Sequence, residues 1–183
     1  MSECVILVGL PASGKTTFYN RRFSTSHRHI SKDHWPNAPR KDERQRRLID
    51  EALGRGESIV VDNTNPTLAD RRAIIDAARP HGAHIVCYYL DASTREAVGR
   101  NRGREGAARV PDVAIFTKAK RMVVPALEEG FAELYRVSIR DDGEFDVRAI
   151  TAGSTDSSRT VTSVSSALRG ENTHGVDHGD GHT

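Results

Sequence analysis

The chain has 183 residues, of which 37% are hydrophobic and 28% charged, and its formal net charge is +2. This length and composition are typical of one soluble globular domain with a single core. No apolar run approaches the roughly 20 residues of a membrane span, and the first apolar run follows the N-terminus without a basic leader, so we expect a cytoplasmic protein without a membrane segment. Cys4 and Cys87 both fall in apolar segments and are expected to be free core residues.

Strand and helix signals alternate along the first 150 residues. Strands are expected at 4–9, 27–31, 58–62, 83–91, 134–140 and 144–150, and helices at 16–23, 40–55, 67–82, 93–102 and 111–122. Asn65 and Pro66 are interpreted as the cap and first turn of the third helix, and the "DDG" stretch at 141–143 predicts a hairpin. Alternation of this kind predicts an α/β fold of the P-loop NTPase type, a mostly parallel sheet with helices on both faces and a C-terminal hairpin.

Composition changes near residue 150. The chain has 27 basic and 25 acidic residues, of which residues 151–183 hold two and four. Residues 1–150 therefore hold 25 basic and 21 acidic residues, a net charge of +4. The last segment is dominated by Ser, Thr, Gly, His and Asp, with too few large apolar groups to offset the entropy of ordering it. We therefore expect one domain over residues 1–150 and a disordered tail over 151–183, whose His174, His178 and His182 form only a weak metal-chelating pattern.

The stretch "GLPASGKT", Gly9 to Thr16, fits the pattern G-x-x-x-x-G-K-S/T between a strand and a helix, as a phosphate-binding loop requires. Backbone amides of such a loop surround the β-phosphate, Lys15 reaches the β- and γ-oxygens, and Thr16 offers a hydroxyl to Mg²⁺. The alternative is a flexible turn beside a surface lysine. The absence of an N-K-x-D guanine signature favours ATP over GTP. The predicted ATP-binding residues are Gly9, Ala12, Ser13, Gly14, Lys15, Thr16 and Thr17.

Two carboxylates follow strands. Asp62 ends the expected strand 58–62, where a second carboxylate can orient the water shell of Mg²⁺, so Thr16 and Asp62 form the predicted metal set. Asp33 follows the expected strand 27–31, at the carboxyl edge where open α/β sheets bind ligands. A carboxylate there can take a hydroxyl proton. A helix or turn cap is the alternative interpretation of Asp33.

The stretch "GRNRGREGAARVP" contains Arg100, Arg102, Arg104 and Arg109 among glycines. The glycines suggest a mobile lid, and a lid arginine can neutralise charge that develops on a phosphoryl group during transfer. A solvated helix end is the alternative for any one of these arginines.

Four features together resemble the polynucleotide 5′-kinase family, in particular the kinase module of the polynucleotide kinase/phosphatase type, over about residues 4–140. They are "GLPASGKTT", Asp33 with Arg40 seven residues later, "VVDNTNPTLADRR", and "NRGREGAARVPD" followed by "PALEEGF". The resemblance implies transfer of the ATP γ-phosphoryl group, with Mg²⁺, to the 5′-hydroxyl of DNA or RNA ends. Lys32, where the family often has arginine, and the two prolines within 35–39 depart from the family pattern.

The resemblance also implies roles for particular residues. Lys15, Asp33 and Arg104 would be catalytic, with Asp33 the general base and Arg104 the lid arginine. Arg40 would bind the phosphate next to the terminal nucleoside, and the remaining acceptor-site residues would be Asp62, Asn63 and Asn65. The chain has no D-x-D-G-T phosphatase motif, so phosphatase or ligase activity would have to come from other proteins.

Basic residues gather in the first 50 positions and suit a nucleic-acid partner, although a solvated basic helix explains them equally well. They are Arg21, Arg22, Arg28, Lys32, Arg40, Lys41, Arg44, Arg46 and Arg47. Two other functions stay open from the sequence. One is a small-metabolite P-loop kinase, and the other is a non-catalytic ATP-binding module.

Overall fold

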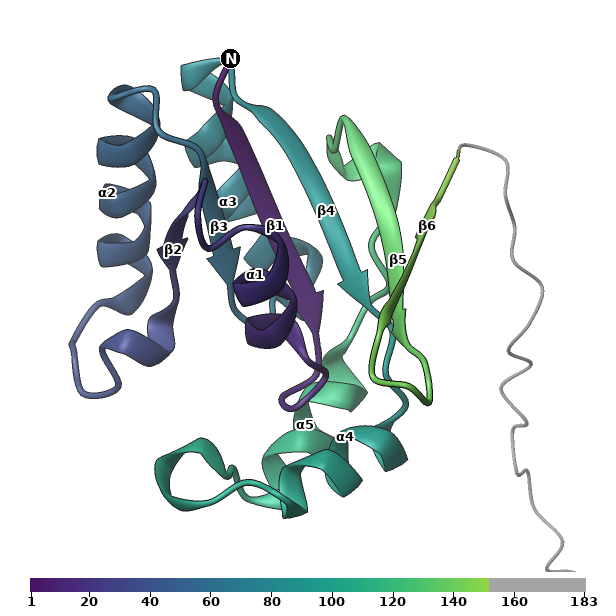
Figure 1. Ribbon diagram of the computed structural model, residues 1–183. Helices are drawn as coiled ribbons and strands as arrows, with labels where there is room; N and C mark the ends of the chain where they lie inside the picture. Colours follow the sequence, from purple (N-terminus) through teal and green to yellow (C-terminus); the bar gives the residue numbers. More distant parts are fainter. Residues whose placement is uncertain (152–183) are drawn as a thin grey trace, which may run out of the picture.

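A single mixed sheet forms the centre of the molecule, and the computed structural model describes residues 1–151 (Figure 1). Its strands are β1 (Glu3–Gly9), β2 (Arg28–Ile30), β3 (Ile59–Asp62), β4 (His84–Leu90), β5 (Glu133–Ile139) and β6 (Phe145–Ala149). Their order across the sheet is β2-β3-β1-β4-β5-β6, and every neighbouring pair is parallel except β5 and β6. The α/β class, the mostly parallel sheet and the C-terminal hairpin predicted from the sequence are thus confirmed.

Helices and short 3₁₀ turns connect the strands. The helices are α1 (Lys15–Arg22), α2 (Lys41–Gly54), α3 (Leu68–Ala78), α4 (Thr94–Arg102) and α5 (Asp112–Arg121). The 3₁₀ turns are η1 (Lys32–His34), η2 (Arg79–His81), η3 (Gly106–Ala108) and η4 (Leu127–Glu129). Within residues 1–151, no helix has both the length and the apolar character that crossing a bilayer would require.

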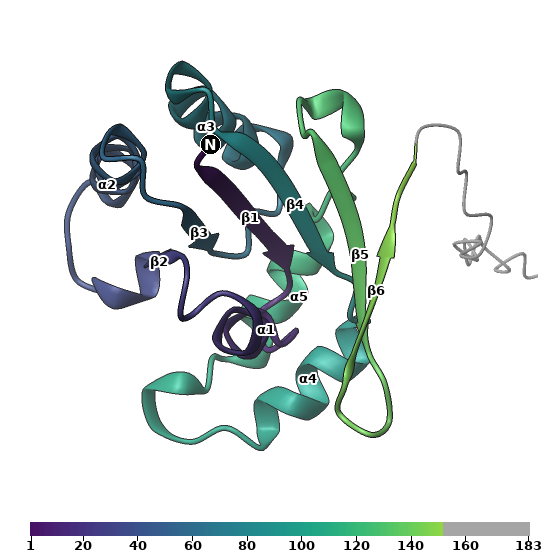
Figure 2. The ribbon, with the colours of Figure 1, turned by 45° about the horizontal axis from the view of Figure 1, so that its top comes forward.

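The sheet is covered on both faces, because the side chains of β1 alternate between them. Cys4, Ile6 and Val8 pack in one core cluster with α2 and α3, whereas Val5 and Leu7 pack in a second cluster with α1. Figure 2 shows α2 and α3 on one side of the sheet and α1 on the other. A strand buried on both faces reads as a continuous apolar run, which is why "CVILV" carries no polar residue.

The carboxyl ends of the parallel strands form the working edge of the sheet. β1 leads there into α1, β2 into η1 and β3 into the turn before α3. Helices α4 and α5 lie beyond this edge (Figure 1), where Leu10, Ala97 and Ile115 form a small separate cluster. Residues from these three connections and from the segment of α4 and α5 are therefore brought to one edge.

The predicted start of the third helix is wrong. α3 begins at Leu68, and Thr67 caps it in a reciprocal capping box with Asp70. Asn65 lies before this cap in the left-handed region, with φ 43°, and its side-chain amide donates to the Leu7 carbonyl oxygen at 2.7 Å. Its donor is therefore committed to the end of β1 and does not cap the helix.

Cys4 and Cys87 are free and buried, as expected. Burial raises the pKa of the Cys4 thiol to about 12. The predicted tail, including its three histidines, lies outside the described residues apart from Thr151.

Candidate functional site

The loop between β1 and α1 has a backbone that requires its two glycines. A Cβ on Gly9 would lie 2.7 Å from Ser13 Oγ and 2.9 Å from the Leu90 carbonyl oxygen, closer than real contacts allow. Gly14 has φ 99°, and a Cβ there would lie 2.8 Å from Ile139 Cδ1. Ala12 also lies in the left-handed region, with φ 62°, a conformation that costs an L-residue about 1–2 kcal/mol. The surrounding structure thus holds this loop in a strained shape, as is common at binding sites.

Lys15 is the buried cation at the centre of this loop. Its Nζ donates to the carbonyl oxygens of Gly9 at 3.0 Å and Leu10 at 2.8 Å. Burial lowers the pKa of Lys15 to about 8, while the charges of Asp62 and Asp33 oppose that shift and the charge of Arg104 adds to it. Charged groups from three separate parts of the chain therefore influence the pKa of one ammonium.

Thr16 and Asp62 meet directly. Thr16 Oγ1 donates to Asp62 Oδ2 at 2.8 Å, and the carboxylate also contacts His29 Nε2 at 3.0 Å. Burial alone would raise the pKa of Asp62, but the hydrogen bonds from His29 and Thr16 and the charge of Lys15 outweigh it and leave that pKa below its ordinary value. Asp62 is thus an ionised carboxylate in a buried position.

The chemistry of this pair fits a magnesium ion. Mg²⁺ prefers oxygen ligands, keeps several waters, and is often bound by one or two protein groups together with substrate phosphates. Thr16 supplies a hydroxyl oxygen and Asp62 a carboxylate. In the described part of the chain, no cluster of three or more His, Cys, Asp or Glu side chains is arranged to hold a metal ion. Thr16 and Asp62 would hold the ion only together with bound phosphates and water, so their metal role stays a prediction.

Asp33 lies in η1, which follows β2, and β3 separates β2 from the strand that precedes the loop. The cap of this turn is Ser31, whose hydroxyl accepts from the Asp33 N–H at 3.3 Å, and the Asp33 side chain is exposed. Asn63 fastens the turn, because its Oδ1 accepts from the Lys32 N–H at 2.9 Å and its Nδ2 donates to Gln45 Oε1 at 2.7 Å. The structure therefore uses Ser31 as the cap and leaves the Asp33 carboxylate accessible.

The other predicted acceptor residues are placed differently from one another. Asn65 is buried against β1, and the side chain of Asn63 holds η1, so both make internal contacts. Arg40 precedes α2 with φ 50°, its side chain is 78% exposed, and it lies 3.6 Å from Glu43. Substrate binding by these three residues stays a prediction, with Arg40 the accessible one.

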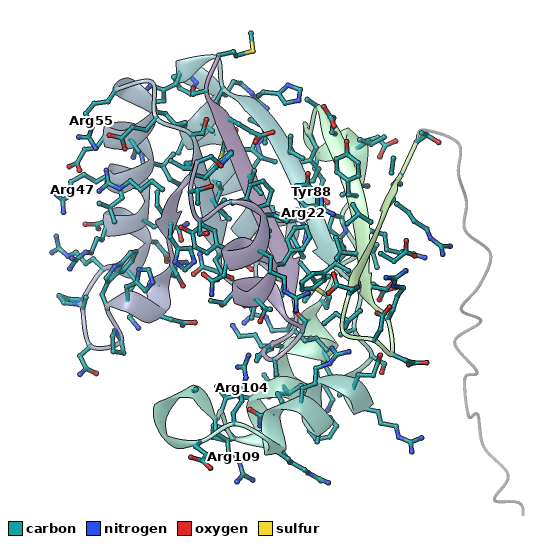
Figure 3. The ribbon with its side chains drawn as sticks, in the orientation of Figure 1. Arg22, Arg47, Arg55, Tyr88, Arg104 and Arg109 are labelled. Carbon is teal, nitrogen blue, oxygen red and sulfur yellow. The ribbon has the colours of Figure 1, made fainter. Side chains whose placement is uncertain are left out.

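Among the four predicted lid arginines, Arg104 is the one whose charge acts on Lys15. Figure 3 shows Arg104 on the side of the segment that faces α1 and Arg109 on its outer side. Arg100 and Arg102 lie 3.6 Å from Glu96 and 3.8 Å from Asp112, respectively. The lid role of Arg104 stays a prediction, which its orientation toward α1 supports.

The basic residues of the first 50 positions are largely engaged with neighbours. Six of the nine form ion pairs: Arg21, Arg28, Lys32, Arg40, Arg46 and Arg47. Two more lie over aromatic rings, Arg22 over Phe18 and Arg44 over Trp35. The cluster is therefore spread over several elements and partly neutralised.

Sequence reasoning missed three residues of this site. Ser31 caps η1, His29 contacts Asp62, and Asn101 ties the segment after α4 to Val110 and Asp112. Only Ser31 had a local signal, a hydroxyl residue directly before a turn. His29 and Asn101 act through partners 33 and 9–11 residues away in sequence.

A phosphate-binding loop at the carboxyl edge of a parallel sheet, with a buried lysine and a threonine–aspartate pair, defines a nucleotide-binding P-loop protein. Residues 4–125 match the family model described as "AAA domain", which is more than half of the chain. The chain belongs to this family.

Individual proteins resemble the chain in part. It is 30% identical over 142 residues to the bifunctional polynucleotide phosphatase/kinase of Schizosaccharomyces pombe, covering 75% of this chain and 34% of that protein. The chain spans about a third of the length of the curated relatives it matches.

Two solved structures share the fold. A sugar kinase from Janibacter superposes with a TM-score of 0.59 at 15% identity, covering 75% of this chain and 86% of the other. A fungal RNA kinase superposes with a TM-score of 0.56 at 18% identity, covering 75% of this chain and 38% of the other. At these identities the likeness shows the fold alone.

Proposed function

We propose that the chain is an ATP- and Mg²⁺-dependent polynucleotide 5′-hydroxyl kinase, which transfers the γ-phosphoryl group to the 5′ ends of DNA or RNA. The observation that carries the proposal is that Lys15, the Thr16–Asp62 pair and the exposed carboxylate of Asp33 lie at the same carboxyl edge of the sheet. Arg104 lies on the side of its segment that faces α1 (Figure 3). Phosphoryl transfer needs a cation that binds the phosphates, a carboxylate for the metal ion, a second carboxylate for the acceptor hydroxyl and an arginine for the transferred phosphoryl group.

Each residue has one task in the proposed reaction. Lys15 and the loop amides hold the ATP phosphates, and Arg104 neutralises charge on the phosphoryl group during transfer. Asp33 accepts the proton of the acceptor hydroxyl, whose oxygen attacks the γ-phosphorus while the bond to the β–γ bridging oxygen breaks and ADP leaves. Bound Mg²⁺ supplies further neutralisation of the phosphate charge. The Thr16 hydroxyl donates a hydrogen bond to Asp62, which leaves the lone pairs of its oxygen free to bind a metal ion.

The acceptor class rests on sequence likeness, because the fold is shared with a sugar kinase as well as with an RNA kinase. The matched relative is a phosphatase/kinase for polynucleotides, and this chain aligns with about a third of it. We therefore propose the kinase reaction alone for the described domain.

Labelled ATP tests the acceptor class directly. The purified chain is incubated with γ-labelled ATP and a panel of 5′-hydroxyl DNA and RNA oligonucleotides, nucleosides and sugars. The proposal expects label on oligonucleotide 5′ ends. Label on a nucleoside or sugar only would indicate a metabolite kinase, and no label on any acceptor despite ATP binding would indicate a binding module. Either result would overturn the proposal.

Asp33→Asn tests the general base. This variant keeps the size of the side chain but cannot accept the proton, so turnover should fall by about 10²- to 10⁴-fold with little change in oligonucleotide affinity. Asp42→Asn is the matched control, because Asp42 is an exposed carboxylate near η1 that pairs with Lys32. Equal activity of Asp33→Asn and Asp42→Asn would remove Asp33 from the mechanism.

Arg40→Ala tests the contact to the acceptor phosphate. If Arg40 binds the phosphate next to the terminal nucleoside, the variant should raise the KM for a 3′-phosphorylated nucleoside and for oligonucleotides, and hardly change that for a nucleoside without this phosphate. Arg47→Ala serves as control, since Arg47 is an exposed arginine of α2 that pairs with Glu51. A uniform effect on every acceptor would contradict the assignment.

A further inference from the structure

His29 lies between the loop that binds phosphate and the turn that carries Asp33, yet the proposed reaction gives it no task. It is the middle residue of the three-residue strand β2, in register with Val60 of β3. Its side chain is 17% exposed, so the ring is mostly enclosed by its neighbours. A short edge strand thus carries an imidazole into the site.

Three side chains determine where this ring lies. The Tyr19 ring of α1 stacks on it, with ring centroids 4.0 Å apart and planes inclined by 10°. The His34 ring of η1 meets its edge, at 4.7 Å and 74°. On a third side, Nε2 lies 3.0 Å from Asp62 Oδ2. The imidazole is therefore held between α1, η1 and the end of β3, the three elements that bring the proposed ATP, acceptor and metal residues together.

The donors and the acceptor of the hydrogen bonds at Asp62 can be assigned. Thr16 Oγ1 and His29 Nε2 both approach the same oxygen, Oδ2, at 2.8 and 3.0 Å. A carboxylate oxygen accepts hydrogen bonds, so Thr16 Oγ1 and His29 Nε2 are the two donors. Two donors on one oxygen fix the plane of the carboxylate and keep Thr16 turned toward it. Without the histidine, a single bond from Thr16 would hold a buried charge.

We propose that His29 is a positioning residue of the metal site, which orients the Asp62 carboxylate and through it the Thr16 hydroxyl for a bound Mg²⁺–nucleotide. This inference rests on the proposed roles of Thr16 and Asp62. Groups that hold metal ligands in place typically contribute 10- to 100-fold to metal affinity or activity. Tyr19 of α1 and His34 of η1 pack against the His29 ring and so determine its orientation. The ring in turn determines the orientation of Asp62 at the end of β3.

Two variants of His29 separate positioning from packing. His29→Phe keeps a ring against Tyr19 but removes the donor to Asp62, whereas His29→Gln keeps an amide donor near the position of Nε2. His27→Phe is the matched control, because His27 also contacts a carboxylate, Glu3 at 2.7 Å, and an aromatic ring, Phe23 at 4.9 Å, near the start of β2.

The primary measurement is the binding of a fluorescent ATP analogue as Mg²⁺ is titrated, which requires no acceptor and no turnover. His29→Phe should raise the Mg²⁺ concentration at half-saturation by about tenfold or more. His29→Gln should restore much of this loss, and His27→Phe should behave like the parent. In an Asp62→Asn background, His29→Phe should cause no further change in the Mg²⁺ midpoint, because the carboxylate that His29 positions is absent.

Several results would overturn the inference. One is a His29→Phe midpoint equal to that of His27→Phe, and another is equal impairment of His29→Phe and His29→Gln at matched melting temperatures. A full His29→Phe effect in the Asp62→Asn background would do the same. Failure of the proposed kinase activity shows itself separately, as absence of labelled acceptor with the parent chain, while the Mg²⁺ titration still reports on His29.

Discussion

At the scale of single residues, Lys15 combines burial with a positive charge. Its ammonium is held by two backbone carbonyls, and burial lowers its pKa from 10.5 to about 8. A depressed lysine pKa means that the charge is present below about pH 8 and is lost as the pH rises through that value. The phosphates of ATP prefer the charged form, so the affinity of the free protein for ATP depends on this proton.

We therefore predict that ATP binding weakens above about pH 8. The dissociation constant of a fluorescent ATP analogue should be flat between pH 6.5 and 7.5 and rise toward tenfold per pH unit above the lysine pKa. Lys15→Met has a side chain of similar length without charge, so it should bind the ATP analogue weakly, and its dissociation constant should not change slope near pH 8. A break of the same size in Lys15→Met would show that another group titrates.

At the scale of secondary-structure elements, buried polar side chains fasten the connections at the working edge. Arg71 of α3 is fully buried and forms a two-pronged pair with Glu129 of η4, at 2.6 and 2.7 Å. Its remaining nitrogen donates to the carbonyl oxygens of Asn65 at 3.1 Å and Val123 at 3.0 Å. One guanidinium thus joins α3, the turn after β3 and the segment that follows α5.

Arg71→Met should destabilise the domain strongly, because it leaves the Glu129 charge and two carbonyls buried without their partner. Removal of one member of a buried ion pair costs about 3–5 kcal/mol. Arg72→Met is the matched control, since Arg72 pairs with Asp76 on the surface and such pairs contribute about 0–1 kcal/mol. Urea denaturation measures both. Similar unfolding free energies for the two variants would contradict the structural role of Arg71.

Asn101 fastens the segment that carries Arg104. It is fully buried, its Nδ2 donates to the Val110 carbonyl oxygen at 2.7 Å and to Asp112 Oδ1 at 3.0 Å, and its Oδ1 accepts from the Val110 N–H at 3.1 Å. Both ends of the stretch 102–109 are therefore held against one amide. The position of Arg104 depends on that amide even though Asn101 lies in the interior.

We predict that Asn101→Ala loosens this segment and lowers turnover more than ATP affinity. The loss of buried hydrogen-bond partners should cost about 1–3 kcal/mol, and the Val110 amide should exchange its hydrogen faster. Arg102→Ala removes an exposed partner of the same Asp112 and should leave the unfolding free energy and the exchange rate of the Val110 amide near those of the parent. Unchanged exchange at Val110 in Asn101→Ala would refute the fastening role.

At the scale of the whole molecule, the last strand of the described residues packs into the domain. β6 pairs with β5 along its length, and its first residue, Phe145, packs against Phe18 of α1 with ring centroids 5.0 Å apart. The Ile150 N–H donates to the Leu134 carbonyl oxygen at 2.8 Å. The edge strand therefore belongs to the core that supports α1.

Deletion of residues 151–183 should leave the melting temperature and the proposed kinase activity nearly unchanged, because the composition of that segment offers little apolar surface. Deletion of residues 145–183 should instead lower the melting temperature strongly, since it removes β6 and the ring that packs on Phe18. Thermal unfolding and the labelled-ATP assay compare the two truncations. A large loss with the shorter deletion would mean that the tail contributes to the domain.

Much of the fold and part of the site could be predicted from the sequence, because the signals are local. The phosphate-binding loop is one continuous stretch whose glycines and following helix define its shape, so Lys15 and Thr16 were identifiable from it. The strands β1, β3, β4 and β5 are apolar or β-branched runs, and all six expected strands lie within a few residues of the observed bounds. The error at Asn65 has the same origin, because asparagine before proline is a local cap signal that a contact with Leu7 overrides.

The sequence grouped Thr16 with Asp62 as a predicted metal set, but the tertiary structure alone decided that their side chains are in direct contact and which further residues join them. Thr16 reaches Asp62 across 46 positions, His29 reaches the same carboxylate across 33, and Arg71 reaches Glu129 across 58. None of these pairs has a local pattern, since each is set by the order of the strands in the sheet and by which side chains are buried at its edge. A hydrogen bond or ion pair needs its two atoms within about 3–4 Å, and only the folded chain determines that distance.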